Sequence, residues 1–215
     1  MFTYSSKIFS VPDEDTARRI ILTPDGRSTD ERWKTETPAS VDLAAPFLDL
    51  GPDKTLLDYG CGIGRMSKAM IDRFGCKVIG VDISPEMRDL APKYVQSPLF
   101  SIHSRESFLA LARGGFRVDS AISIWVLQHC QDPGVDLEII GLAFRPESRL
   151  FVINNTFRAV PVAERPFVND GRDVRALLGE RFKEVASGDL SIEQVGPVLA
   201  PCSYWGVYEP AIAAG

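Results

Sequence analysis

The chain has 215 residues, of which 45% are hydrophobic and 25% are charged, and its formal net charge is −5. This length predicts one domain with at most a small appendage, and the composition excludes the disordered, collagen-like and coiled-coil classes. The acidic balance argues against broad electrostatic capture of nucleic acid or anionic lipid, because neutralising phosphates requires clustered Lys and Arg.

The first elements differ in character from the rest of the chain. Residues 1–45 are expected to form a small N-terminal helical cap that packs on a main domain of residues 46–215. A helix is predicted from Thr37, which can cap its N-terminus, with Pro38 in its first turn and Gly51 after its end.

From residue 55 onward, short apolar runs alternate with amphipathic stretches. Strands are expected at residues 56–59, 78–81, 99–102, 118–124 and 150–153, and helices at residues 66–74, 85–94, 107–113 and 135–144. This alternation predicts an α/β, Rossmann-like, doubly wound fold with a mostly parallel sheet and helices on both faces.

The last third of the chain breaks this alternation. A helix is expected at residues 172–178, followed by strands at residues 182–185 and 204–208 with no obvious helix between them. Such strands favour an antiparallel hairpin that closes one edge of an otherwise parallel sheet.

A glycine-rich turn follows the first strand of this pattern. Gly60 can adopt backbone angles closed to other residues, Gly62 lets a ligand approach the main chain, and Gly64 lets the next helix start close to the strand. Asp82 ends the following strand about twenty residues later, where a carboxylate can accept hydrogen bonds from both ribose hydroxyls and would repel a 2′-phosphate. The alternative is a tight turn that binds no ligand.

The spacing of the glycines separates two kinds of nucleoside cofactor. The third glycine is Gly64, whereas the dinucleotide fingerprint would place it at Arg65. With Asp58 before the turn and Val-Ile-Gly-Val-Asp-Ile-Ser-Pro-Glu-Met at 78–87, the segment resembles the class I S-adenosylmethionine (SAM)-dependent methyltransferases. The resemblance implies SAM as cofactor, S-adenosylhomocysteine as product, and a seven-stranded sheet whose last strand is inserted antiparallel.

The resemblance also implies which residues bind the cofactor. The residues expected to border its methionine and ribose parts are Asp58, Gly60, Cys61, Gly62, Gly64, Asp82 and Ile124. The residues expected around its adenine are Ile83, Met87, Ser104 and Arg105. The family often carries an acidic residue followed by a small one after the third strand, and this chain has His-Ser-Arg-Glu at 103–106 instead.

The run Ser-Ile-Trp-Val-Leu-Gln-His at 123–129 is similar to the exit of the fourth strand in many such enzymes. His129 is the candidate general base, because an imidazole there could take a proton near neutral pH. The alternative is that His129 orients the loop by bonding a backbone carbonyl. The residues expected in the substrate pocket are Trp125, Gln128, Asn154 and Trp33, although a tryptophan can equally serve packing and an asparagine a turn.

The expected function is methyl transfer to a small-molecule or sugar-like acceptor, at a hydroxyl oxygen. The alternatives are methylation of RNA or protein, and a non-catalytic or NAD-binding module. The scattered cysteines predict neither a metal site nor disulfides. No nucleic-acid or membrane partner is expected. The short apolar runs and polar N-terminus predict a cytoplasmic protein, either a short enzyme or one domain of a larger one.

Overall fold

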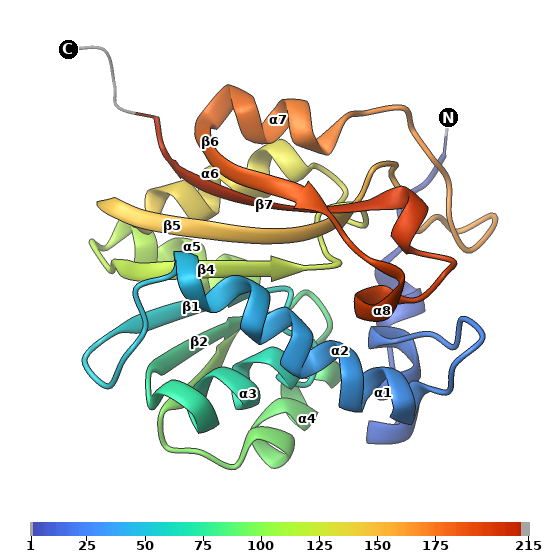
Figure 1. Cartoon of the computed structure of the whole chain (residues 1–215), viewed down its shortest axis with the longest axis horizontal. Helices are drawn as coiled ribbons and strands as arrows, with labels where there is room; N and C mark the ends of the chain where they lie inside the picture. The colour runs from blue at the N-terminus through green and yellow to red at the C-terminus, as the bar shows by residue number, and fades with distance from the viewer. Residues whose placement is uncertain (1, 212–215) are drawn as a thin grey trace.

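The computed structural model describes residues 2–211, which form a seven-stranded sheet with the order β3-β2-β1-β4-β5-β7-β6 (Figure 1). The parallel strands are β1 (Thr55–Tyr59), β2 (Lys77–Val81), β3 (Phe100–His103), β4 (Val118–Ile124) and β5 (Phe144–Asn155). The strand β7 (Ser203–Pro210) lies between β5 and β6 (Phe182–Asp189) and is antiparallel to both. The expected fold class and the inserted antiparallel strand are confirmed.

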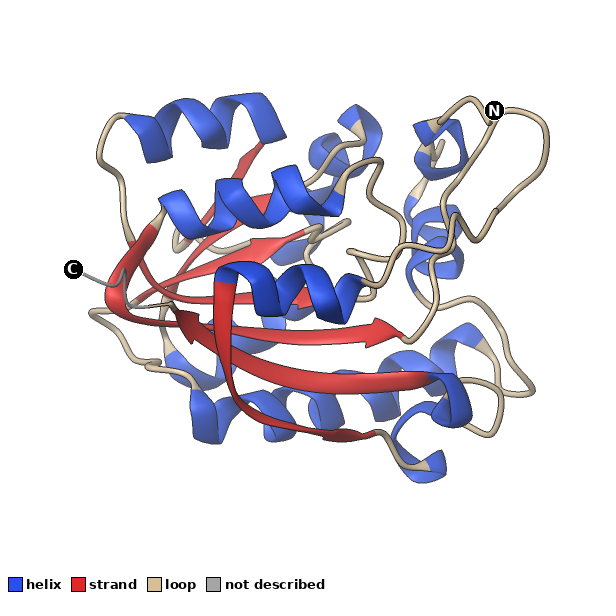
Figure 2. Cartoon of the chain, turned by 90° about the horizontal axis from the view of Figure 1, so that it is seen from above, coloured by secondary structure: helices blue, strands red, loops and turns tan. Residues whose placement is uncertain are grey.

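Helices cover both faces of the sheet (Figure 2). One face carries α2 (Thr29–Ala44), α3 (Arg65–Phe74) and α4 (Pro85–Val95), and the other carries α5 (Arg105–Arg113), α6 (Pro133–Leu142) and α7 (Val174–Arg181). Successive strand residues enter opposite cores: Leu56 packs with the α2–α4 side and Leu57 with the α5–α7 side. Both strand faces are therefore apolar, as is usual for a parallel sheet between two helical layers.

The N-terminal helices differ from the prediction. The helix α2 begins at Thr29, about two turns before the predicted start at Thr37, and Pro38 lies inside it. Its start is set by a capping box, because the Glu31 amide donates to Ser28 Oγ at 3.2 Å and the Ser28 amide donates to Glu31 Oε2 at 2.7 Å. A further helix, α1 (Glu14–Ile21), is capped by Asp13 and was not predicted.

The region between α6 and β5 also differs from the prediction. The helix ends at Leu142 and β5 begins at Phe144, within the residues predicted as helix. A shift in the pairing of β4 with β5 separates the pair Val118–Phe144 from the pair Ser120–Arg149. Ser148 donates to the Val118 carbonyl at 2.7 Å, which satisfies a backbone group that the irregular pairing leaves open.

The N-terminal segment lies at the end of the molecule where β4 terminates (Figure 1). Val11 and Ala17 pack against Ile63 of the glycine-rich turn and Met87 of α4. A short helix, α8 (Ile192–Val195), contacts α2. Within residues 2–211, no helix combines the length and apolar character needed to span a bilayer.

Candidate active site

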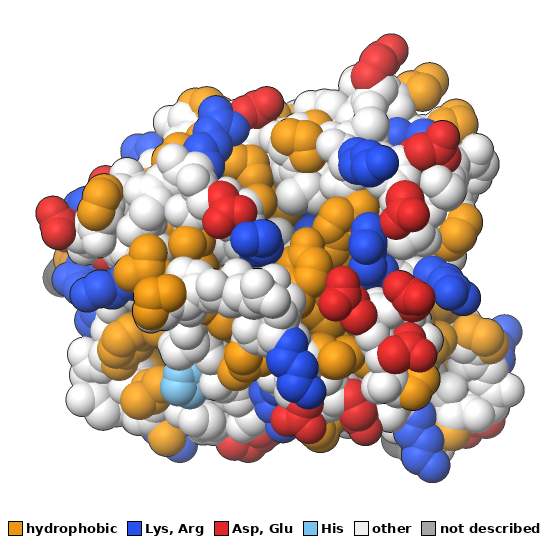
Figure 3. Space-filling view, turned by 90° about the horizontal axis from the view of Figure 1, so that it is seen from below, with side chains coloured by type: hydrophobic (Ala, Val, Ile, Leu, Met, Phe, Trp, Pro, Cys, Tyr) orange, Lys and Arg blue, Asp and Glu red, His pale blue; other side chains and the backbone are white. Residues whose placement is uncertain are grey.

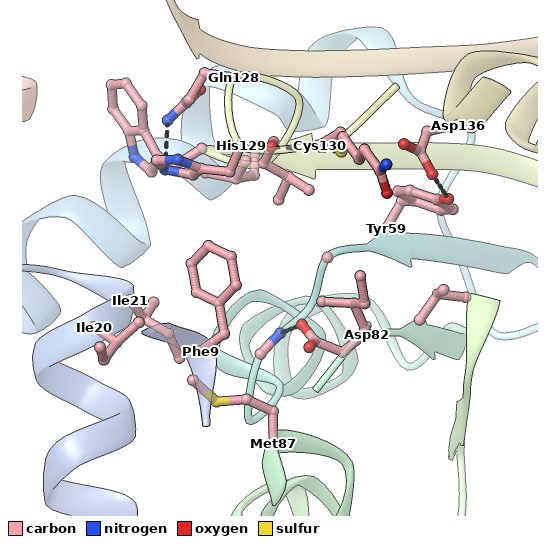
Figure 4. Close-up of a pocket in the computed structure, with 18 of the residues that line it drawn as sticks. Phe9, Ile20, Ile21, Tyr59, Asp82, Met87, Gln128, His129, Cys130 and Asp136 are labelled. Carbon is pink, nitrogen blue, oxygen red and sulfur yellow. Dashed lines mark hydrogen bonds between the residues drawn. The ribbon is translucent and has the colours of Figure 1, made fainter. Parts of the chain in front are cut away.

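A cavity of about 520 Å³ opens at the carboxyl ends of the parallel strands (Figure 4). Ligands in open α/β sheets bind at this edge. The wall combines residues that follow β1, β2, β4 and β5 with side chains of the N-terminal segment. Figure 4 shows His129 and Gln128 on one side of the cavity, and Asp82 with the Tyr59–Asp136 pair on the other.

The glycine-rich turn and Asp82 form one hydrogen-bonded unit in this wall. Gly60 and Gly62 have φ angles of 80° and 56°, which glycine adopts without strain. The Gly62 amide donates to Asp82 Oδ2 at 2.8 Å, and the Ser84 amide donates to Oδ1 at 2.9 Å. Burial raises the pKa of Asp82, whose carboxylate nevertheless borders the cavity and can accept further hydrogen bonds.

Three of the residues expected at the cofactor lie behind this wall. Asp58 accepts a hydrogen bond from Ser67 Oγ at 2.6 Å, and burial raises its pKa to about 6. A Cβ on Gly64 would lie 2.4 Å from a Val95 methyl, so Gly64 allows α3 to start against α4. Cys61 is buried and donates weakly to the Gly62 carbonyl. These residues support the turn.

Of the four residues expected around the adenine, three line the cavity and one does not. Ile83, Met87 and Arg105 line the cavity, as does Ile124 at the end of β4. Ser104 instead caps α5, because its hydroxyl accepts from the Ser107 amide at 3.2 Å.

A buried carboxylate that the sequence analysis did not identify lies beside Arg105. Asp136, in the first turn of α6, accepts from the Tyr59 hydroxyl at 2.5 Å and from Arg105 Nε at 2.7 Å. Burial, and then the Asp136 charge, raise the pKa of Tyr59, so the phenol keeps its proton. Burial also raises the pKa of the adjacent Cys130 thiol, which points to the Val126 carbonyl.

His129 sits between two aromatic rings, with ring centroids 5.8 Å from Phe9 and 5.2 Å from Phe167. Its Nδ1 lies 2.6 Å from the Ala159 carbonyl oxygen, which can only accept, so Nδ1 carries the proton. Nε2 then holds the lone pair, and the Gln128 amide nitrogen lies 3.3 Å from it. Burial lowers the pKa of His129, so the imidazole is neutral at pH 7.

A buried arginine holds the loop that carries His129. The Arg158 guanidinium donates to the Leu127 carbonyl at 2.8 Å and to the Cys130 carbonyl at 2.6 Å. It also pairs with Asp170, with N–O distances of 3.2 Å to both carboxylate oxygens. The residues on either side of His129 are therefore fixed by one side chain that is 1% exposed.

The expected substrate residues lie in two places. Trp125 and Gln128 line the cavity, and Trp125 has a φ of 63°, a strained backbone for a bulky residue that costs roughly 1–3 kcal/mol. Asn154 is fully buried outside the wall, where it accepts from the Gln128 amide at 3.1 Å. Trp33 is also outside the wall, and its indole donates to the Tyr94 hydroxyl at 2.9 Å, which docks α2 on α4.

The N-terminal segment supplies an apolar part of the wall that the sequence analysis missed. Phe9, Ile20 and Ile21 line the cavity, and Figure 4 shows Phe9 below His129. The signal for α1 was present in the sequence, since Asp13 precedes an apolar spacing of Ala17, Ile20 and Ile21. Nothing local in that pattern indicates which surface the helix covers.

Comparison with known proteins gives one family. The sequence model described as "Methyltransferase domain" matches residues 31–178. The N-demethylindolmycin N-methyltransferase of Streptomyces griseus is 34% identical over 54% of this chain and 49% of that protein. The ubiquinone biosynthesis O-methyltransferase of Cereibacter sphaeroides is 37% identical over 43% of this chain and 36% of that protein. The chain thus spans half or less of the length of these curated relatives.

Solved structures share the fold at low sequence identity. A geranyl diphosphate C-methyltransferase from Streptomyces coelicolor, in complex with S-adenosyl-L-homocysteine, superimposes with a TM-score of 0.65 at 14% identity, covering 98% of this chain and 90% of that one. The [4+2]-cyclase SpnF has a TM-score of 0.62 at 15% identity, covering 90% of this chain and 87% of that one. Since one fold hosts different reactions, these likenesses establish the architecture alone.

Proposed function

The chain belongs to the class I SAM-dependent methyltransferase family, and on this premise we propose that it transfers the methyl group of SAM to a hydroxyl oxygen of a small, largely apolar molecule. The observation that carries the proposal is the geometry of His129. This neutral imidazole has its proton fixed on Nδ1 and its lone pair on Nε2, at the wall of the same cavity as Asp82.

SAM, the cofactor of this family, fits the residues present. Asp82 offers a buried carboxylate to the ribose hydroxyls, and Ile83 and Met87 offer apolar contacts to the adenine. A Cβ on Gly62 would lie 2.7 Å from Ile21 Cδ1, so glycine at this position lets α1 pack against the turn. Gly60 and Gly62 line the cavity and would border the methionine part of the cofactor.

When bound, the cofactor would supply an electrophilic methyl group: an acceptor oxygen would attack the methyl carbon opposite the sulfur, the carbon–sulfur bond would break, and S-adenosylhomocysteine would leave. The chain's own task is to align the acceptor, exclude water and take up its proton. His129 Nε2 would accept the hydroxyl proton, the acceptor taking the place of the Gln128 amide that now lies 3.3 Å away. Phe9, Ile20 and Ile21 would keep water from the transfer site.

The lining of the acceptor side favours an apolar body with few polar groups. Phe9, Ile20, Trp125 and Leu199 contribute hydrocarbon surface there. The one cation of the N-terminal wall, Arg32, is paired with Glu36, with N–O distances of 2.5 and 3.0 Å. Hydroxyls of a sugar placed against this hydrocarbon surface would lack partners, which is costly, whereas Gln128, Gln131 and Asn155 on the same cavity could bond a few polar groups.

A macromolecular acceptor is less well supported. On the face drawn in Figure 3, basic and acidic side chains are intermingled and apolar side chains lie between them. Nucleic-acid binding instead depends on clustered positive charge. We therefore propose a small molecule as the partner, rather than nucleic acid or a membrane.

The test is transfer of label from methyl-labelled SAM to separate pools of phenols, aromatic amines, sugars, RNA and protein. We expect label in the phenols, and its loss in the Asp82→Asn variant. Transfer only to amines would replace the hydroxyl with a nitrogen acceptor, and transfer only to RNA or protein would overturn the small-molecule proposal. No transfer to any pool despite tight binding of SAM would overturn the activity itself.

A further inference from the structure

Asp136 is a buried carboxylate whose two donors occupy the same oxygen. The Tyr59 hydroxyl and Arg105 Nε both donate to Oδ1, at 2.5 and 2.7 Å. Within residues 2–211, no N–H or O–H group donates to the other oxygen, Oδ2, and the neighbouring Cys130 thiol is directed to the Val126 carbonyl. Asp136 is 5% exposed and borders the cavity. Its second oxygen is thus a hydrogen-bond acceptor available to a ligand.

This oxygen belongs to the nucleoside side of the cavity. Tyr59, Arg105 and Asp136 share the cavity wall with Asp82 and Ile83, and Figure 4 shows the Tyr59–Asp136 pair on the Asp82 side, away from His129. Arg105 begins α5 directly beyond β3, the strand next to β2 at the sheet edge. A nucleoside whose ribose is bound at the end of β2 would therefore extend its base toward this group.

The chemistry of the group selects the ligand edge that it can bind. The guanidinium of Arg105 compensates the Asp136 charge, and the protonated Tyr59 phenol donates to it. A carboxylate can only accept hydrogen bonds, so the ligand must present an N–H or O–H. Adenine presents an exocyclic amino group, whereas its deaminated counterpart presents a carbonyl oxygen at the same position.

No residue directly after β3 provides a carboxylate to the cavity. Ser104 caps α5, Arg105 donates to Asp136, and the Glu106 carboxylate does not line the cavity. We propose that Oδ2 of Asp136 accepts the exocyclic amino group of the SAM adenine, and that Tyr59 and Arg105 hold the carboxylate in place. This inference rests on the proposed function, because the adenine is that of SAM.

The test compares the binding of S-adenosylhomocysteine and S-inosylhomocysteine to the whole chain by titration calorimetry. The wild-type protein is expected to bind the inosyl compound about 10- to 100-fold more weakly, because a charged acceptor would lose its donor and face a carbonyl oxygen. In Asp136→Asn this ratio should fall to within about threefold, since an amide can present either a donor or an acceptor.

Asp132→Asn is the matched control. Asp132 also lines the cavity, one turn earlier, and caps α6 by accepting from the Gly134 amide at 3.1 Å. Asparagine caps equally well, so the wild-type ratio should persist in this variant. If Asp136→Asn does not fold, Tyr59→Phe takes its place: it removes one donor from Oδ1 and should lower the ratio by about threefold or more.

The outcomes separate this inference from the proposed function. If S-adenosylhomocysteine binds but the wild-type protein does not discriminate against the inosyl compound, Asp136 is not the acceptor. The inference is equally overturned by an unchanged ratio in Asp136→Asn, by an unchanged ratio in Tyr59→Phe, or by a ratio lost in Asp132→Asn. If the wild-type protein binds no S-adenosylhomocysteine, the proposed function fails, and this inference fails with it.

Discussion

His129 has a different partner at each ring nitrogen, and this difference permits a test at the scale of one residue. In His129→Asn, the side-chain amide can still donate to the Ala159 carbonyl, but no group can take a proton where Nε2 lies. We expect kcat to fall by about 10²- to 10⁴-fold, the usual contribution of a general base. The dissociation constant of S-adenosylhomocysteine should stay within about twofold of wild type, because Asp82 is untouched.

The pH profile gives a second prediction for the same residue. Burial lowers the pKa of His129 below its ordinary value of about 6.5. The imidazole becomes protonated only as the pH falls through this lowered pKa, so kcat/KM should plateau at neutral pH and decline on the acid side, with an apparent pKa below about 6.5. Between this lowered pKa and the ordinary pKa of histidine, the unfolded chain binds more protons than the folded protein. The free energy of unfolding should therefore also decrease as the pH falls through this range.

The other histidine provides the control for this profile. His103 ends β3 and is not part of the cavity wall. His103→Asn should therefore keep the acid decline of kcat/KM, whereas His129→Asn should flatten what activity remains. An acid decline that persists in His129→Asn would assign the titration to another group and leave His129 as a loop-orienting residue.

At the scale of structural elements, Arg158 joins the loop after β4 to the segment between β5 and α7. Arg158→Met would leave the carbonyls of Leu127 and Cys130 without their donor, whereas Asp170 would keep the Arg172 amide. Asp170 is exposed, so the cost comes mainly from the two carbonyls left unsatisfied, and the free energy of unfolding should fall by about 2–4 kcal/mol. Urea denaturation followed by circular dichroism measures the loss.

An exposed ion pair is the comparison for this substitution. Lys68 and Asp72 lie one turn apart on α3, 3.1 Å from each other, with both side chains largely in solvent. Lys68→Met should change the free energy of unfolding by less than about 0.5 kcal/mol. Equal small losses in both variants would mean that Arg158 does not hold the loop that carries His129.

The same scale shows what the sequence could predict. Each strand from β1 to β5 has its own apolar run, and the glycine turn with Asp82 is a local pattern, so both could be identified from the residues. The start of α2 was misplaced because Pro38 was interpreted as a first-turn residue, although the Ser28–Glu31 capping box lies upstream. Pro38 is instead accommodated within a helix whose C-terminal half is buried against the sheet.

The contacts that sequence patterns could not predict join residues far apart in the chain. Tyr59 and Asp136 are 77 positions apart, and Arg158 reaches Leu127 across 31. No periodicity connects such residues, because their contact depends on how α6 and the segment after β5 pack on the completed sheet. The contact of Tyr59 with Asp136, and that of Arg158 with the loop that carries His129, could therefore be found only in the structure.

At the scale of the whole molecule, one ligand would connect the turns after β1 and β2 with the N-terminal segment, so its binding should stabilise the entire fold. A ligand at about 100 times its dissociation constant adds roughly 2.7 kcal/mol to the free energy of unfolding. For a chain of this size, that corresponds to a rise in Tm of about 5–11 °C. We expect this rise with S-adenosylhomocysteine and none with NAD, measured by thermal unfolding.

Two variants show whether the rise comes from the nucleoside site. Asp82→Asn should abolish it and should also lower the Tm of the free protein, because asparagine can accept from only one of the two amides, Gly62 and Ser84, that donate to the carboxylate. Asp89→Asn, on the exposed side of α4, should retain the full rise. A rise in Tm with NAD instead of S-adenosylhomocysteine would contradict the proposed cofactor. A rise with S-adenosylhomocysteine that survives in Asp82→Asn would place the ligand elsewhere, since the carboxylate at the end of β2 is the group proposed to bind its ribose.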